Sequence, residues 1–233
     1  MNKPTKTTRP PATRQRILKI ATEEFANRGF AGARIETIMR RSKVSKNLIY
    51  HYFKSKEQLF RTVLEADYEK IRFDRVDWPV AGRDPVDNMR HLVGLIFDHW
   101  KMSNQFIKLL VSENFSKGKH IRQLGRIKDE YSRRIDRIES VLAEGVRQGT
   151  IRPGIDAAEL YISISAMIYH RISNRYTLSF LLDRNYEDDA SLEACRRHVE
   201  DFVMAYIEAP TDGSATGVAA ETPPDIPGAP QPE

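Results

Sequence analysis

The chain has 233 residues, of which 40% are hydrophobic and 30% are charged, so it can form one or two domains around an apolar core and does not have the composition of a disordered protein. Its single cysteine, Cys195, excludes a disulfide within the chain and suits a reducing compartment. No apolar run reaches the roughly 18 to 20 residues that cross a bilayer, and no apolar stretch follows the basic N-terminus as it would in a secretory signal. We therefore expect a cytoplasmic protein without a membrane partner.

The net charge of +5 is unevenly distributed along the chain. Residues 1–63 contain 15 Lys and Arg against 4 Asp and Glu, a net charge of +11, so the remainder carries −6. A basic head on an acidic body is typical of proteins that bind polyanions such as DNA, although a solvated surface with chance clustering gives the same count.

The hydrophobic pattern predicts an all-α fold of about nine helices, because no stretch shows sustained strand-like alternation and no Asn-Gly or Asp-Gly hairpin occurs. Residues 1–11 hold three prolines and residues 210–233 hold six, so we expect a mobile basic arm and a disordered tail. The first helix, with Ile17, Ala21 and Phe25 on one face, should end at Gly29. The later helices are expected from Ser55 toward Trp78-Pro79, from Asp84-Pro85, and over about 103–118, 120–149, 156–182 and 191–207.

The segment RIETIMRRSKVSKNLIYHYF, residues 34–53, has the pattern of a helix-turn-helix. A short apolar-striped helix is followed by Ser42-Lys43-Val44, and Ser45 then provides the N-cap of a second short helix. Val44 should fill the angle between the helices, while the second helix exposes donors and aromatic groups suited to DNA. Any α-hairpin with a polar face would show a similar pattern on its own.

The context makes the pattern specific. The run from Gly29-Phe30 through Val44-Ser45 to Tyr50-His51-Tyr52-Phe53-Lys54-Ser55-Lys56-Glu57-Gln58-Leu59 closely resembles the DNA-binding domain of the TetR/AcrR family of regulators. The resemblance covers about residues 12–72. It implies an N-terminal helix-turn-helix domain, followed over 73–209 by a helical domain for effector binding and dimerisation.

The resemblance also implies roles for individual residues. Lys46 and Asn47 match the positions that enter the major groove first, and Tyr50 and Tyr52 match aromatic positions near base methyl groups and the backbone. Lys56 matches a phosphate-holding lysine, and a helix N-terminus capped by Ser55 is also a physically suitable anion site. The full set of predicted DNA contacts is Arg34, Lys43, Ser45, Lys46, Asn47, Tyr50, His51, Tyr52 and Lys56.

Two departures from the family pattern affect this segment. Ala33 and Arg34 replace the usual hydroxyl residues, so the first helix of the motif loses an obvious N-cap, although Arg34 should still reach a phosphate. Lys43 stands at a turn position where glycine is frequent, and it carries backbone strain if that turn needs a positive φ.

A single helix-turn-helix makes few contacts, so we expect a homodimer that reads a near-palindromic operator in double-stranded DNA. The resemblance implies that the last two helices form the dimer, and the sequence offers apolar residues there: Leu160, Ile164, Met167, Ile168, Ile172, Phe180 and Leu181, then Val199, Phe202, Val203 and Tyr206. These helices pack equally well within one subunit on sequence grounds alone.

The resemblance further implies a small-molecule effector, of unidentified structure, bound by the middle helices. The predicted effector-binding residues are His91, Trp100, Phe115, Tyr169, His170, Arg171, Asn174 and Arg175. Arg171, Asn174 and Arg175 have the spacing of one helical face and could meet a carboxylate, although a polar surface face has the same spacing.

These features predict a ligand-responsive transcriptional regulator, most simply a repressor that its effector releases from DNA. The alternative within DNA-binding proteins is a regulator or architectural protein without an effector. We expect no enzyme, because no nucleophile elbow, phosphate-binding glycine loop or HExxH motif occurs, and no residues are predicted to bind a metal or a cofactor.

Overall fold

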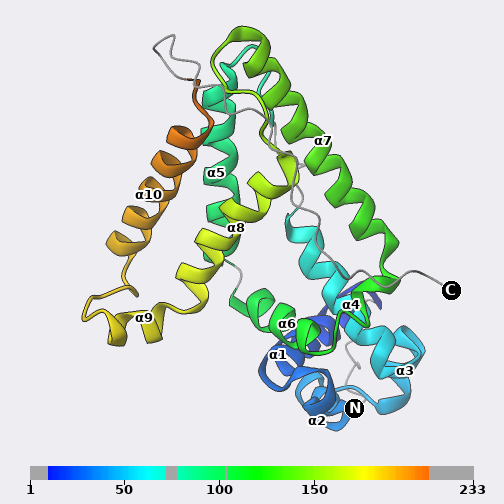
Figure 1. Ribbon diagram of the computed structural model, residues 1–233. Helices are drawn as coiled ribbons and strands as arrows, with labels where there is room; N and C mark the ends of the chain where they lie inside the picture. Colours follow the sequence, from blue (N-terminus) through cyan, green and yellow to red (C-terminus); the bar gives the residue numbers. More distant parts are fainter. Residues whose placement is uncertain (1–9, 72–77, 103, 210–233) are drawn as a thin grey trace, which may run out of the picture.

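The computed structural model describes residues 10–71, 78–102 and 104–209. Within these ranges the chain forms ten α-helices and no strand, which confirms the predicted all-α fold. Figure 1 shows the helices in two groups, with α1–α4 and α6 gathered at one end and the long helices α5, α7, α8 and α10 forming the rest of the molecule. Residues 1–9 and 210–233, which hold most of the predicted arm and tail, lie outside the described residues.

The N-terminal group consists of α1 (Pro10–Gly32), α2 (Ile35–Ser42), α3 (Lys46–Phe53) and α4 (Lys56–Tyr68). One face of each helix enters a shared core, in which Phe25, Phe53 and Phe60 are almost completely buried. The predicted end of the first helix at Gly29 corresponds to a break within α1, where Gly29 has φ 64° before a last helical turn. Pro10 and Pro11, assigned to the arm from the sequence, already belong to α1.

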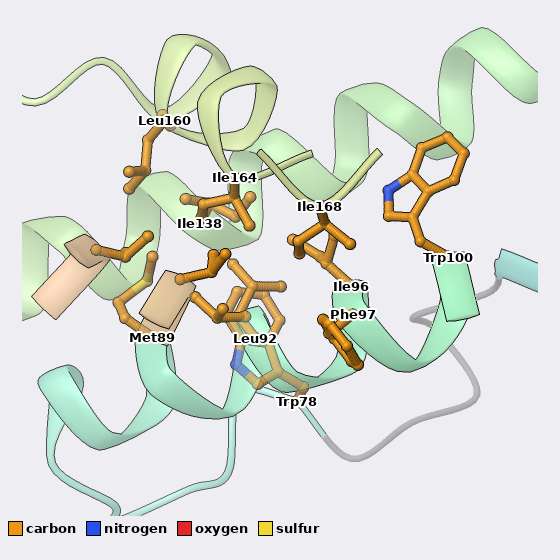
Figure 2. Close-up of a cluster of buried hydrophobic side chains, with 14 of the residues drawn as sticks. Trp78, Met89, Leu92, Ile96, Phe97, Trp100, Ile138, Leu160, Ile164 and Ile168 are labelled. Atoms are coloured by element: carbon orange, nitrogen blue, oxygen red, sulfur yellow. The ribbon is translucent and has the colours of Figure 1, made fainter. Parts of the chain in front are cut away.

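The second group is built from α5 (Pro85–Met102), α7 (Gly125–Gln148), α8 (Ala157–Ser173) and α10 (Asp189–Ile207). Their apolar stripes meet in a separate core that includes Met89, Leu92, Ile138, Ile164 and Ile168 (Figure 2). The end of α10 is fixed by a β-bridge between Ile151 and Glu208, in which the Arg152 N–H donates to the Ile207 carbonyl at 2.9 Å.

Helix α6 (Asn104–Phe115) connects the two groups. Its Leu109 is completely buried in the core of α1–α4. The Phe30 N–H donates to Ser112 Oγ at 3.4 Å, and a Cβ on Gly29 would lie 3.0 Å from the same oxygen. A movement of α6 therefore reaches α1 directly, because the two helices touch without intervening space.

A buried polar pair strengthens this junction. The Glu113 carboxyl, at the end of α6, accepts the backbone N–H of His120 at 2.6 Å and that of Ile121 at 2.9 Å, and its other oxygen lies 2.8 Å from His120 Nδ1. The imidazole of His120 packs on the rings of Phe30 and Phe60, with centroid distances of 4.5 and 4.8 Å. The pair thus joins the loop before α7 to the core of the N-terminal group.

The helix predicted from Ser55 ends earlier than expected. It was expected to run toward Trp78-Pro79, but α4 ends at Tyr68 and tightens into a 3₁₀ turn, Glu69–Ile71. The Glu69 N–H meets the carbonyls of both Glu65 and Asp67, which is how a helix end satisfies its last acceptors without a glycine or proline to mark it.

The predicted helix over 156–182 is wrong as a single element, because it divides into α8 and α9 (Arg175–Leu181). At the junction the His170 carbonyl accepts both the backbone N–H of Asn174 at 3.1 Å and its side-chain amide at 3.0 Å, so the Asn174 side chain folds back on the end of α8. The remaining boundaries shift by a few residues: α7 begins at Gly125 after a 3₁₀ turn, Ile121–Gln123, and α10 is capped by Asp188. Ser103, the expected cap of α6, lies outside the described residues.

Candidate nucleic-acid interface

Helices α2 and α3 form the predicted helix-turn-helix through the turn Lys43-Val44-Ser45. Lys43 adopts the left-handed conformation, with φ 54° and ψ 44°, so lysine stands where the turn requires a positive φ. Ser42 is completely buried and bonds the Ile38 carbonyl at 2.6 Å, and Arg16 Nε donates to the Ser42 carbonyl at 3.0 Å. These bonds hold the turn against α1 despite the strained residue.

The start of α3 presents a polar face. Ser45 caps the helix by accepting the Leu48 N–H at 3.2 Å. Lys46, Asn47 and His51 are exposed, while Ile49 and Phe53 on the opposite face are buried. Tyr50 and Tyr52 are half-buried at the flanks and contribute to the packing of the N-terminal core. The helix can therefore be held firmly by one face while the other meets a partner.

Lys46 is engaged by an acidic neighbour on α2. Its Nζ lies 3.0 Å from Glu36 Oε1, and both side chains are more than half exposed. The hydrogen bond lowers the pKa of Glu36 and raises the pKa of Lys46, so both groups stay charged at neutral pH. Any phosphate or base that binds Lys46 must compete with Glu36.

The N-terminus of α2 is stabilised without the usual hydroxyl cap. Arg34 occupies the N-cap position and makes no side-chain capping bond, as its residue type predicts. The buried Glu24 holds the N-cap residue in another way, since its Oε1 accepts the N–H of Arg34 itself at 3.2 Å. The Arg34 side chain consequently stays exposed, close to the first turn of α2.

Lys56, the first residue of α4, turns toward the N-terminal core. Its Nζ lies 3.3 Å from the Ala31 carbonyl and 5.0 Å from the Phe30 ring centroid, and partial burial lowers the pKa of the ammonium group. Ser55 caps α4 by accepting the Gln58 N–H at 3.0 Å, as predicted. The Lys56 ammonium group is thus held beside the last turn of α1.

Family comparisons agree with this geometry. Residues 17–63 match the family model described as bacterial regulatory proteins, tetR family, and residues 85–203 match the tetracyclin repressor-like C-terminal domain. The chain belongs to the TetR family. Its members are transcriptional regulators, and this TetR-family protein is a DNA-binding transcriptional regulator of the helix-turn-helix type.

Individual relatives cover most of the chain. The HTH-type transcriptional repressor NicS of Pseudomonas putida is 33% identical over 170 residues, which are 73% of this chain and 80% of NicS. A transcriptional regulator from Saccharomonospora viridis, solved in complex with choline, has a TM-score of 0.65 at 24% identity and covers 86% of this chain and 100% of that one. FadR from Bacillus subtilis, solved in complex with stearoyl-CoA, has a TM-score of 0.63 at 17% identity, over 84% of this chain and 100% of its own.

The structure does not bring the eight predicted effector residues together. Trp100 and Tyr169 do meet, edge to face at 5.2 Å, and Trp100 is buried. Phe115 is 87% exposed at the end of α6, His170 is exposed, and His91 lies beside Arg83 on an open surface between α5 and α10.

Arg171, Asn174 and Arg175 do not lie on one continuous helix, because α8 ends before Asn174, and their predicted effector role stays a prediction. Arg171 donates to Ser191 Oγ at 2.7 Å and stacks on Tyr186, and so holds the loop before α10. Arg175 donates to the Ile172 carbonyl at 2.8 Å. These residues serve the α8–α10 connection in this structure.

A polar and aromatic cluster in this regulator was not predicted from the sequence. It consists of Tyr68 from α4, Tyr131 and Arg134 from α7, and Tyr161 from α8, and the Arg134 residue is only 6% exposed. Arg134 lies on the same apolar stripe of α7 as Ile127, Tyr131 and Ile138. A charged residue inside that stripe was the signal that could have revealed the cluster.

The described helices include none that is long and apolar enough to span a bilayer. The described residues likewise contain no group of three or more His, Cys, Asp or Glu arranged to hold a metal ion.

Proposed function

We propose that the protein is a dimeric repressor that binds a near-palindromic operator through α3 and leaves it when a small-molecule effector binds the second helical group. The observation that carries the DNA-binding part is the exposed face of Lys46 and Asn47 on a capped helix whose other face is buried. Lysine and asparagine at the start of a recognition helix suit phosphate and base-edge contacts.

The proposed roles are distinct. Asn47 reads base edges, while Lys46 and His51 meet bases or phosphates beside it. Arg34, Lys43 and Lys56 neutralise phosphates, Ser45 positions α3, and Tyr50 and Tyr52 contact the sugar-phosphate backbone or base methyl groups. The net charge of +11 over residues 1–63 supports this division, because phosphate contacts supply most of the affinity and base contacts supply the specificity.

The proposal is tested with operator DNA selected from a random pool by the full-length protein. Asn47→Ala should reduce the affinity for the selected site by about 1–3 kcal/mol and leave the affinity for scrambled DNA nearly unchanged, because only a base contact distinguishes the two. Lys46→Ala should weaken both. Asn185→Ala and Lys101→Ala, which remove the same groups at exposed positions of the second helical group, should change neither. Equal losses on both DNAs for Asn47→Ala would contradict the base-reading role.

The proposed dimer surface lies on α8, α9 and α10, and the structure changes which residues belong to it. Six of the residues assigned to it from sequence are buried within their own subunit: Leu160, Ile164, Ile168, Ile172, Val199 and Val203. The large apolar residues left exposed on these helices are Ile162, Tyr176, Phe180, Leu181, Phe202 and Tyr206. Exposed apolar side chains on these helices would be covered by a partner surface, and a second copy of the chain is the partner that a palindromic site requires.

Phe202→Asp tests this surface, because it places a charge where the dimer would bury a ring. We expect a shift from dimer to monomer in analytical ultracentrifugation, together with weaker operator binding. Phe115→Asp is the matched control, since Phe115 is even more exposed but lies on α6. A monomeric wild-type protein, or equal effects of the two variants, would contradict the proposed interface.

The effector and the repressing action are proposed on two grounds. NicS carries the name of a repressor, and two similar folds were solved with choline and with stearoyl-CoA. In this chain α6 contacts the second core and also α1 and α4, so a ligand in the second group has a route to α3 through α4. The effector shifts the population toward a dimer whose recognition helices no longer match the half-site spacing of about 34–36 Å. Operator binding places the proposed site of action in the cytoplasm.

A further inference from the structure

A cavity of about 270 Å³ lies between the end of α4 and the start of α7. It is lined by Tyr68, Ile121, Leu124, Ile127, Lys128 and Tyr131. Cavities of about 150 Å³ hold a benzene molecule, and drug-sized ligands need about 300–1,000 Å³, so this space suits a ligand of one or two rings. A long acyl chain would not fit without a large rearrangement.

The two tyrosines give the cavity aromatic walls. The rings of Tyr68 and Tyr131 have centroids 6.0 Å apart and an interplanar angle of 70°. Burial raises the pKa of both hydroxyl groups above the usual range, so both keep their protons. The Tyr131 hydroxyl already shares a hydrogen bond with Tyr161, so Tyr68 is the tyrosine that can donate to an acceptor on a ligand.

Lys128 brings positive charge to the cavity from α7. Lys128 and Tyr131 are three residues apart and are neighbours on the helix surface, whereas Arg134, six residues from Lys128, is turned about 120° from it into the interior. Lys128 lines the cavity. The buried Arg134 stacks on the Tyr131 ring at 4.4 Å and donates from Nη1 to the Tyr161 hydroxyl at 2.8 Å.

The neighbouring buried acids are occupied or point elsewhere. Glu113 accepts the hydrogen bonds from His120 and Ile121 described above. Asp67 contacts Lys70 and lines a different, smaller cavity of about 140 Å³ beside Phe106. No acid lines the cavity between Tyr68 and Tyr131 among the described residues.

We propose that this cavity is the effector site and that it binds a small organic anion with one or two flat rings. The ring lies against Tyr68 and Tyr131, and the acidic group meets Lys128. A quaternary ammonium ligand would also find aromatic faces here, but Lys128 would repel it. This assignment rests on the proposed effector response and adds to it the place and the chemical class of the ligand.

Tyr68 also gives the site a route to DNA. It is the last residue of α4, and Lys56 is the first residue of the same helix. A ligand that displaces the Tyr68 ring therefore moves the helix that carries a proposed phosphate contact. The site differs from the eight residues predicted from sequence, none of which lines it.

The test uses the full-length protein without DNA and three probes: benzoate, benzamide and choline. Ligand-observed NMR suits it, because single-ring probes bind weakly. Benzoate should bind about threefold to fivefold tighter than benzamide, which has the same ring without the charge, since an ion contact with an exposed lysine is worth up to about 1 kcal/mol. Choline should not bind measurably.

Two variants on α7 locate the charge contact. Lys128→Gln should lower benzoate affinity to about that of benzamide and leave benzamide binding unchanged. Arg133→Gln removes an exposed charge from another face of α7 and should change neither. Both positions are exposed, so neither variant should unfold the protein.

Three outcomes would overturn the inference: binding of none of the probes, equal binding of benzamide or choline, or equal effects of Lys128→Gln and Arg133→Gln. The operator experiment separates this failure from failure of the proposed function. A protein that binds operator DNA but fails the probe test retains its proposed DNA-binding role, whereas benzoate binding without operator binding removes that role and leaves the ligand site.

Discussion

The Glu113 carboxyl makes a quantitative prediction about the junction between the two helical groups. Glu113 is 3% exposed and satisfies two backbone N–H groups and one imidazole nitrogen. Glu113→Ala removes the acceptor and leaves these three groups without it. An unsatisfied buried polar group costs about 1–3 kcal/mol, so we expect the free energy of unfolding to fall by about 4 kcal/mol. That is a large part of the 5–15 kcal/mol typical of a folded domain.

Urea unfolding followed by far-UV circular dichroism measures this effect. Glu113→Gln keeps one carbonyl oxygen for the backbone N–H groups and should cost only about 1–2 kcal/mol. Glu139→Ala, at an exposed position of α7, should change stability by less than about 0.5 kcal/mol. A loss below about 1 kcal/mol for Glu113→Ala, or equal losses for the alanine and glutamine variants, would refute the role given to these hydrogen bonds.

Three further predictions concern other parts of the molecule. Gly145→Ala should lower the free energy of unfolding by about 1–2 kcal/mol in thermal denaturation, because its Cβ would lie 2.5 Å from the buried Ile151 side chain; an unchanged melting temperature would count against that close contact. Burial, together with Arg134 and Lys70, lowers the pKa of His99 from 6.5 to about 4, so the unfolded chain takes up this proton before the folded protein does. The His99 contribution to the free energy of unfolding should be fully present above pH 6.5 and fall by on the order of 3 kcal/mol as the pH drops toward 4. His99→Gln should flatten that profile, and an unchanged profile would contradict the assignment. Glu36→Gln frees Lys46 from its ion pair and removes a negative charge near the DNA, so operator affinity in fluorescence anisotropy should rise about threefold; a lower affinity would show that Glu36 positions Lys46 for binding.

The helix-turn-helix could be predicted closely from sequence because its signals are local. Ser45 and Ser55 cap helices with their own side chains, and the alternation of exposed and buried residues in α3 follows the 3.6-residue period. Even the strain at Lys43 could be anticipated, since only the turn geometry of neighbouring residues decides it. The hydrogen bond between the Arg34 N–H and Glu24 could not be anticipated, because Glu24 belongs to another helix.

The interior of the second helical group was harder to predict because long-range packing decides it. The division of α8 from α9 at Asn174 is not marked by a glycine or a proline, so helix propensity alone does not reveal it. The dimer and effector residues were predicted from polar or apolar stripes along the helices. Several of the apolar residues are instead buried by packing within their own subunit. The cluster of Tyr68, Tyr131 and Arg134 comes from two helices about 60 residues apart in sequence, and only the fold brings it together.

The most direct test of sequence-specific operator binding is the ratio of the affinities for a selected DNA site and for scrambled DNA of equal length, measured at one salt concentration. A dimer that reads DNA through two copies of α3 should select a near-palindrome with half-sites about one helical turn apart and bind it at least about 10³-fold more tightly than scrambled DNA. Equal affinities for the two DNAs, with the steep salt dependence of phosphate contacts alone, would contradict the account.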